Sequence, residues 1–182
     1  PFPAQIEDAT AVYRALLDAG FAPGNMLTAG DSAGGNLAIS MVLKLRESGT
    51  PLPSAVIAFS PWLDMEHTGQ TLVTNAATDG LVSRAILEGM SEMFLGGTGK
   101  ADDPLTNPLY ADFAGFPRLY VNAGSAETLQ DNATRVADRA KSAGVDVTLS
   151  IVEGMQHVFP MLAGRAPEAD AEIARIADWY RR

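Results

Sequence analysis

The chain has 182 residues, of which 47% are hydrophobic and 19% charged, so it holds enough apolar side chains for one globular domain with a sizeable core. Its formal net charge of −9 argues against a nucleic-acid surface and favours a neutral ligand, although the same acidity can serve solubility alone. The absence of cysteine excludes disulfides and a cysteine nucleophile, and two histidines, His67 and His157, argue against a multi-histidine metal site.

Strand and helix signals alternate along the chain, which is typical of an α/β domain with a mainly parallel sheet flanked by helices. The first half predicts a helix over 6–19, a strand over 25–30, a helix with the apolar face Leu37, Met41 and Leu45, and a buried strand over 55–59. The second half predicts a strand over 118–123, a helix capped by Asp131 or Asn132, a strand over 147–151 with Thr148 and Ser150 on a wetter face, and a helix from Pro167 with the apolar face Ile173, Ile176 and Tyr180. We expect about four parallel strands in a single domain over residues 1–182.

One stretch, residues 65–116, is too long for a simple connection between strands. It contains a helical piece over 83–95 and a proline-rich run over 103–108. Long insertions between sheet elements often form lids or binding loops, so we predict a partial cap here, with a packed excursion that never touches substrate as the alternative. Four of its residues can line an acyl pocket or simply pack: Met65, Met90, Met93 and Phe94.

The strongest motif is the run from Gly30 to Gly35, Gly-Asp-Ser-Ala-Gly-Gly, which lies between a predicted strand and a predicted helix. Nucleophilic serines occupy sharp strand-to-helix turns of this kind, because the turn exposes the hydroxyl and needs glycines around it. Ser32 is therefore the candidate nucleophile. The N–H of Ala33 begins the helix, where it can stabilise an oxyanion. A phosphate-binding loop and a turn without function are the alternatives, but the run lacks the Lys-Ser/Thr ending of a P-loop.

His157 is the candidate base, because it follows the last predicted strand and loops leaving the carboxyl ends of parallel strands meet at one edge of the sheet. The acid is expected after the third strand, where Glu127 and Asp131 are available. We favour Glu127, since Asp131 lies where a helix N-cap is expected. His67 precedes both acids and is interpreted as structural or superficial.

These residues define an acyl-transfer mechanism in which His157 accepts the Ser32 proton and Glu127 orients the imidazole. Activity is expected to rise with pH as His157 loses its proton.

The motifs resemble those of the hormone-sensitive-lipase-like carboxylesterases, the bacterial family IV of the α/β-hydrolase superfamily. The likeness rests on the run Gly30 to Gly35, on Ser60-Pro61-Trp62-Leu63-Asp64, on Asp103-Pro104 with Asn107-Pro108-Leu109, on Gly124-Ser125-Ala126-Glu127, and on Gly154-Met155-Gln156-His157-Val158-Phe159. It covers the whole chain. It implies an α/β-hydrolase fold, short-chain ester substrates, no cofactor and no metal, and homodimers as a frequent assembly.

The family also carries an H-G-G-G run that supplies the other oxyanion donors, and this run would precede Pro1. We therefore expect the chain to be the C-terminal part of a longer polypeptide, with the nucleophile strand at a sheet edge. No apolar run approaches the roughly 18–20 residues of a membrane span. A bacterial cytoplasmic location is expected, with a signal peptide in the preceding segment as the alternative.

Two other function classes remain open. A lactonase or thioesterase would use the same triad, and a non-catalytic small-molecule binding module can share the fold. The presence of His157 favours an enzyme over the binding module.

Overall fold

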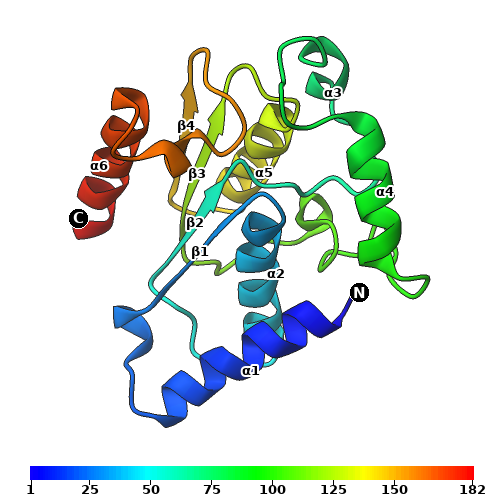
Figure 1. Cartoon of the computed structure of the whole chain (residues 1–182). Coiled ribbons are helices and arrows are strands. Elements are labelled where there is room, and N and C mark those ends of the chain that lie inside the picture. The colour runs from blue at the N-terminus through cyan, green and yellow to red at the C-terminus, as the bar shows by residue number, and fades with distance from the viewer.

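Four apolar segments form one parallel sheet in the computed structural model, which describes residues 1–182 (Figure 1). The strands are β1 (Leu27–Asp31), β2 (Ala55–Phe59), β3 (Arg118–Gly124) and β4 (Val147–Val152), and they lie side by side in this order. Every neighbouring pair is parallel, so each connection must cross over the sheet. The predicted α/β architecture with four parallel strands is confirmed.

Helices cover both faces of this sheet. The six helices are α1 (Ala4–Asp18), α2 (Ala33–Glu47), α3 (Thr71–Thr74), α4 (Arg84–Leu95), α5 (Gln130–Ser142) and α6 (Pro167–Arg181), with short 3-10 turns at Pro23–Asn25, Pro108–Tyr110 and Phe159–Leu162. Of these, α2 and α5 lie on one face of the sheet and α6 on the other. The side chains of Val56 and Ala58 in β2 pack in the core shared with α2 and α5, whereas Ala55 and Ile57 pack against α6. Because both faces are covered, β2 is apolar throughout instead of alternating. None of the helices is both long and apolar enough to span a membrane.

The predicted functional residues all follow the carboxyl ends of strands. Ser32 comes directly after β1, Glu127 lies in the loop after β3, and His157 lies in the loop after β4. In a parallel sheet these ends share one edge, which is where α/β proteins bind ligands. The sheet topology therefore gathers three distant segments of the chain at one place.

The long connection between β2 and β3 contains α3 and α4 (Figure 1). The helical piece predicted over 83–95 is α4, which begins after Ser83, whose hydroxyl accepts a hydrogen bond from the Ile86 N–H at 3.5 Å. It ends at Gly96, which has a φ of 58°. Its inner side joins a small apolar cluster of Trp62, Met65, Leu72, Leu87 and Leu129. The connection is thus packed onto the body of the molecule at the end where the strands terminate.

The predicted cap of α5 is wrong. The helix begins at Gln130, and neither Asp131 nor Asn132 caps it. Both side chains instead accept hydrogen bonds from the segment that follows β2: Asp131 from the N–H of Gln70, and Asn132 from the N–H of Asp64. A tertiary contact has taken the place of a local one.

The inner face of α6 also differs from the prediction. Ile173 is 40% exposed, while Glu172 and Trp179 are buried in its place. Glu172 can be buried because hydroxyl groups on the sheet donate to its carboxylate, among them those of Tyr120 and Ser150. For the same reason Ser150, which was predicted on a wetter face, is only 8% exposed.

Candidate active site

Ser32 occupies a strained turn between β1 and α2, with φ 55° and ψ −117°. The turn brings backbone segments so close together that side chains beyond glycine do not fit. A Cβ added to Gly30 would lie 2.1 Å from the carbonyl oxygen of Gly34, and one added to Gly35 would lie 2.9 Å from the Cβ of Pro61. Strain of this kind at a polar residue is typical of functional sites.

Hydrogen bonds to the loop after β2 hold this turn in place. The Ser32 N–H donates to the carbonyl of Phe59 at 2.9 Å, and the Ser32 carbonyl accepts from the N–H of Trp62 at 3.0 Å. Ala33 is exposed and is the first residue of α2, so its N–H lies at the positive end of the helix dipole. The arrangement presents a hydroxyl beside a group that can stabilise negative charge.

Glu127 and His157 face each other in the loops that follow β3 and β4. Nδ1 of His157 lies 3.7 Å from Oε1 of Glu127, and neither atom has another partner. Glu127 is fully buried and His157 is 9% exposed. The separation exceeds a hydrogen bond, but such contacts in free enzymes often shorten only when substrate is bound.

The other oxygen of Glu127 is already occupied. Oε2 accepts a hydrogen bond from the hydroxyl of Ser60 at 2.7 Å and from the N–H of Gly124 at 3.1 Å. The same Ser60 hydroxyl accepts the N–H of Val158, the residue after His157, at 3.0 Å. Ser60 therefore bonds both to the acid loop, residues 125–129 after β3, and to the base loop, residues 153–158 after β4.

Sequence reasoning did not single out Ser60. In the sequence Ser60 belongs to the Ser-Pro-Trp motif and carries no further mark, since its φ of 43° and full burial are tertiary features. A serine directly after a buried strand, at the same edge as Ser32, was the one available signal.

The base loop turns sharply back over the sheet. Gly154 has a φ of 71°, and a Cβ added to Gly124 would lie 2.1 Å from the carbonyl oxygen of Met155. This close approach brings the His157 loop against the start of the Glu127 loop. A larger residue at Gly124 would force the two apart.

Ser32 and His157 lie on loops that border one hollow, although no hydrogen bond joins the two residues. Asp31, which precedes Ser32, and Val158, which follows His157, both line it together with Phe59. The structure thus brings Glu127 to face His157, while the residues next to Ser32 and His157 line one hollow.

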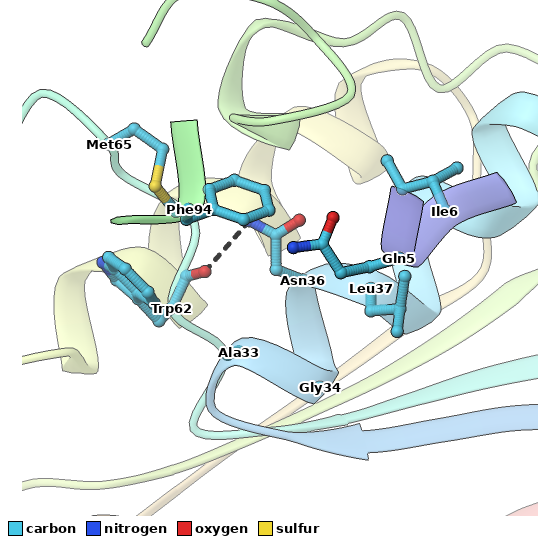
Figure 2. Close-up of a pocket in the computed structure, with 9 residues that line it drawn as sticks. All are labelled: Gln5, Ile6, Ala33, Gly34, Asn36, Leu37, Trp62, Met65 and Phe94. Carbon is cyan, nitrogen blue, oxygen red and sulfur yellow. Dashed lines mark hydrogen bonds between the residues drawn. The ribbon is translucent and has the colours of Figure 1, made fainter. Parts of the chain in front are cut away.

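A second, mainly apolar pocket of about 210 Å³ opens beside the residues that follow Ser32 (Figure 2). Its lining consists of Gln5, Ile6, Ala33, Gly34, Asn36, Leu37, Trp62, Met65 and Phe94. Of the four insertion residues considered for an acyl pocket, Met65 and Phe94 line it. Met93 is 70% exposed, and Met90 packs in the neighbouring apolar cluster. The pocket has the position and polarity to accept an apolar part of a ligand.

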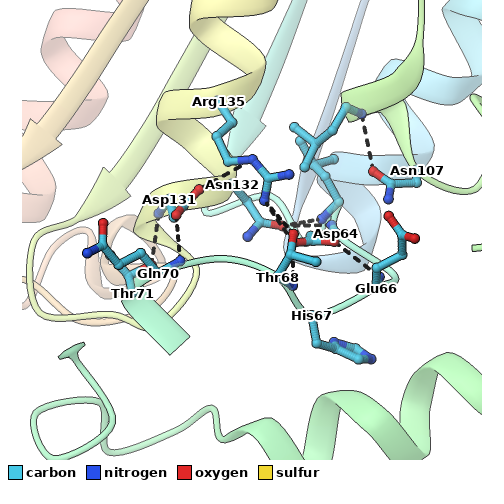
Figure 3. A network of polar contacts seen from close by, with 12 residues as sticks. Asp64, Glu66, His67, Thr68, Gln70, Thr71, Asn107, Asp131, Asn132 and Arg135 are labelled. Atoms are coloured by element: carbon cyan, nitrogen blue, oxygen red, sulfur yellow. Dashed lines mark hydrogen bonds and ion pairs between the residues drawn. The ribbon is translucent and has the colours of Figure 1, made fainter. Parts of the chain in front are cut away.

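Asp131, the alternative acid, makes no hydrogen bond or ion pair with His157 and belongs to a polar network at the base of the insertion (Figure 3). Its carboxylate accepts the N–H of Gln70 at 2.7 Å and lies 3.5 Å from Nε of Arg135. Asp64 is at the centre of the network, where it accepts hydrogen bonds from Thr68 and, at 2.8 Å, from Arg135. Burial opposes the ionisation of Asp64, but the hydrogen bonds from Thr68 and Arg135 and the charge of Arg135 outweigh it, so that the pKa of Asp64 is lowered.

His67 belongs to the insertion and not to this site. Its Nε2 lies 3.0 Å from the hydroxyl of Ser91 in α4, and its carbonyl accepts a hydrogen bond from Arg84. Nowhere in the chain do three histidine, cysteine, aspartate or glutamate side chains gather in a way that could hold a metal ion.

Comparison with known proteins agrees with the fold. A family model described as an alpha/beta hydrolase fold matches residues 1–161. The chain belongs to the alpha/beta hydrolase fold family, the class that the parallel sheet and the strained serine turn define.

Individual relatives within this family are esterases and an acetyl-hydrolase. An acetyl-hydrolase of Streptomyces hygroscopicus is 42% identical over 173 residues, which cover 95% of this chain and 58% of the relative. An esterase of Acinetobacter venetianus is 35% identical over 179 residues, which cover 98% of this chain and 59% of the relative. The crystal structure of an esterase from the bacterial hormone-sensitive lipase family superimposes with a TM-score of 0.97 at 44% identity, covering 100% of this chain and 61% of that one. The chain spans about three fifths of the length of these relatives. The predicted resemblance to hormone-sensitive-lipase-like esterases is confirmed.

Proposed function

We propose that this chain carries the catalytic residues of a serine carboxylesterase that acts on short-chain esters. Ser32 is the nucleophile, His157 the general base and Glu127 the acid that orients the base. The N–H of Ala33 is one oxyanion donor. Residues 1–182 act as a single catalytic domain, in which residues 65–116 form part of a cap.

One observation carries the proposal. The strained turn that exposes Ser32 lies at the same sheet edge as a buried carboxylate and imidazole whose facing atoms, 3.7 Å apart, have no other partner. A buried carboxylate and imidazole facing each other this closely, beside a serine on a strained turn, fit the arrangement that activates a hydroxyl. The relatives named as esterase and acetyl-hydrolase support the same chemistry.

The reaction proceeds in two acyl transfers. The Ser32 oxygen attacks the ester carbonyl carbon while Nε2 of His157 takes its proton, and the carbonyl electrons move to the oxygen beside the Ala33 N–H. Collapse of this intermediate expels the alcohol, which takes the proton from His157. Water then repeats the sequence on the acyl-serine, releasing the acid and restoring Ser32.

The position of Glu127 supports one tautomer of His157 in this proposal. Because its free oxygen faces Nδ1 of His157, that nitrogen carries the proton and Nε2 is left to act as the base. The apolar pocket next to Ala33 would take an apolar arm of the ester, and its volume of about 210 Å³ suits a short one. No cofactor enters this mechanism.

Hydrolysis of p-nitrophenyl butyrate by the full-length product of the coding sequence tests the proposal, with Ser32→Ala as the control. We expect turnover that falls by about 10⁴-fold or more in the variant, because the nucleophile is lost. A folded protein without turnover would contradict the esterase and favour the non-catalytic binding module.

A fluorophosphonate probe separates these outcomes independently of substrate choice. It labels an activated serine, so it should modify Ser32 in the unchanged protein and nothing in Ser32→Ala. A panel of lactones, thioesters and esters would then separate the enzymes that share the triad. Preference for a lactone or thioester would correct the substrate class while leaving the three residues in their roles.

A further inference from the structure

The segment from Thr71 to Val82, which begins with α3, lies at the end of the molecule where β3 and β4 terminate (Figure 1). It belongs to the insertion, and it makes hydrogen bonds to both loops that carry the acid and the base. We call it the clamp segment. Its hydrogen bonds to these loops involve none of the residues that line the apolar pocket, although Leu72 and Val82 pack in the same apolar cluster as Trp62 and Met65.

The clamp segment binds the acid loop along its main chain. The side-chain amide of Asn75 donates to the carbonyl oxygens of Ser125 at 3.0 Å and of Glu127 at 2.9 Å. The hydroxyl of Thr78 donates to the carbonyl oxygen of Ala126 at 3.0 Å. The hydroxyl of Thr71 donates to the carbonyl oxygen of Thr128 at 2.7 Å, so side chains of the insertion hold four consecutive carbonyls of the acid loop.

Asp79 extends these contacts to the donor groups of Thr128, the residue that follows Glu127. One carboxylate oxygen accepts the N–H and the hydroxyl of Thr128 at 2.7 and 2.8 Å. The other oxygen accepts the N–H groups of Leu81 and Val82 at 2.9 and 2.8 Å, which fixes the carboxylate in its own turn. Burial would raise the pKa of Asp79, but these hydrogen bonds outweigh burial and lower it, so the group is a carboxylate at neutral pH.

The base loop is tied to the same segment by Gln156, the residue before His157. Its side-chain amide donates to the carbonyl oxygen of Thr78 at 2.8 Å, and its side-chain oxygen accepts the N–H of Gly80 at 3.0 Å. Thr78 thus touches the acid loop with its hydroxyl and the base loop with its carbonyl.

The reacting pair needs such support from outside the sheet. The regular β3–β4 ladder ends at Gly124 and Val152. Past it, the loops are joined directly near their start, where the Ala126 N–H donates to the carbonyl of Met155 at 3.1 Å and the Gly154 N–H to the hydroxyl of Ser125 at 2.9 Å. None of these direct bonds is made by Glu127 or His157. Ser60 holds them on the inner side, and the clamp segment holds them on the outer side. A misplacement of about 1 Å can cost on the order of 10²-fold in rate, so a firm separation matters.

We propose that the clamp segment sets the separation of the acid and base loops, and that Asp79 and Gln156 are positioning residues for the Glu127–His157 pair. The proposal rests on the proposed function of that pair.

Gln156→Ala is the first test, because the side chain is half-exposed and bonds only to main-chain atoms, so the fold should survive its loss. We expect kcat for p-nitrophenyl butyrate to fall about tenfold while KM stays within about twofold, since the loops move and the pocket does not. Gln130→Ala is the matched control: Gln130 is half-exposed too and begins α5.

Asp79→Asn, alone and combined with Gln156→Ala, tests whether the two residues set the same loop separation. Asparagine keeps the size of the side chain but cannot accept all four hydrogen bonds, so kcat should fall about tenfold or more. Asp103→Asn is the control, because the carboxylate of Asp103 accepts a single hydrogen bond, from the N–H of Leu105 within the same insertion. If both residues set one separation, the double variant should lose little more than Asp79→Asn alone.

Three results would overturn the proposal: kcat values within about twofold of the controls, losses that multiply in the double variant, or losses that appear in KM instead of kcat. Amide hydrogen exchange at residues 125–128 and 155–158 gives a readout that needs no catalysis. We expect it to speed up in both variants and not in their controls. If the unchanged protein has no esterase activity, the proposed function fails, while unchanged exchange in the variants would still reject the clamp.

Discussion

Ser60 shows how much one hydroxyl group can organise at this site. It donates to the buried carboxylate of Glu127 and accepts the N–H of Val158, so the acid and the residue beside the base share a single oxygen. This leaves the second oxygen of Glu127 free to face His157. The side chain does no chemistry itself and acts through the groups it holds.

Ser60→Ala should therefore lower kcat by about tenfold and destabilise the fold by about 1–3 kcal/mol, because two buried polar groups lose their partner. Ser150→Ala is the matched control, since the Ser150 hydroxyl also donates to a buried carboxylate, that of Glu172 at 3.0 Å, and accepts a hydrogen bond from Arg175. Urea unfolding measures the stability of the two variants, and p-nitrophenyl butyrate hydrolysis measures their kcat. Equal losses of activity in the two variants would show that Ser60 contributes only stability.

The glycines of the Ser32 turn are not equivalent. Gly30→Ala should destabilise the chain by several kcal/mol, because its Cβ would lie 2.1 Å from the Gly34 carbonyl oxygen. Gly34→Ala places a Cβ in open space and should be neutral or stabilising by up to about 1 kcal/mol, as alanine favours a helix. Thermal unfolding of both variants measures the difference. A tolerated Gly30→Ala would mean that the turn can relax.

At the scale of elements, α6 is fastened to the sheet by a buried carboxylate. Glu172 is 1% exposed and accepts hydrogen bonds from Tyr120 at 2.8 Å, Asn122 at 2.9 Å and Ser150 at 3.0 Å. These donors stand on β3 and β4, so one side chain joins the last helix to both strands that lead to the acid and base loops.

This arrangement predicts a loss of stability in alkali. Burial, together with the hydrogen bond to Glu172 and its charge, raises the pKa of Tyr120 to about 12 from an ordinary value of 10.0. A pKa raised in the folded state means that the stabilisation is complete below pH 10 and is lost as the pH rises to about 12. The free energy of unfolding should fall more steeply above pH 10 in the unchanged chain than in Tyr120→Phe, and urea titrations at several pH values would show it. Parallel slopes would contradict the assignment.

Features set by a local segment of the chain could be predicted from the sequence, whereas features set by tertiary contacts could not. The four strands and the Ser32 turn follow from local patterns, because apolar runs and glycines report on their own segments. The choice between Glu127 and Asp131 was harder, since both follow the same strand. Only tertiary contacts bring Glu127 to His157 and Asp131 to Gln70.

The role of Ser60 could not be predicted from sequence patterns for the same reason. Its two partners are 67 and 98 residues away along the chain, and no periodicity encodes such an approach. The buried face of α6 was missed similarly, because a glutamate is expected on the solvent side unless its partners on the sheet are known.

At the scale of the whole molecule, the insertion is joined to the body through carboxylates. Asp64 anchors its first residues to Arg135 of α5, and Asp79 anchors the clamp segment to Thr128. In both, burial opposes ionisation but hydrogen bonds prevail, and the pKa is lowered from 3.8.

Acid should therefore loosen this attachment. A pKa lowered in the folded state contributes stability above the ordinary value of 3.8, and this contribution is lost as the pH falls through the lower native value. The urea midpoint should drop on moving from neutral pH to about pH 3, and less so in Asp64→Asn, which is less stable at neutral pH to begin with. An identical acid dependence in the variant would place the sensitivity elsewhere.

The clamp segment grips the acid loop largely through carbonyl oxygens, and every residue type possesses one. The side chain of Ala126, for instance, plays no part in the hydrogen bond that its carbonyl receives from Thr78. Sequence change at this position can therefore proceed without disturbing the neighbouring Glu127. Randomising Ala126 should therefore leave the hydrogen bonds between the clamp segment and the acid loop in place, because they reach only main-chain atoms at this position.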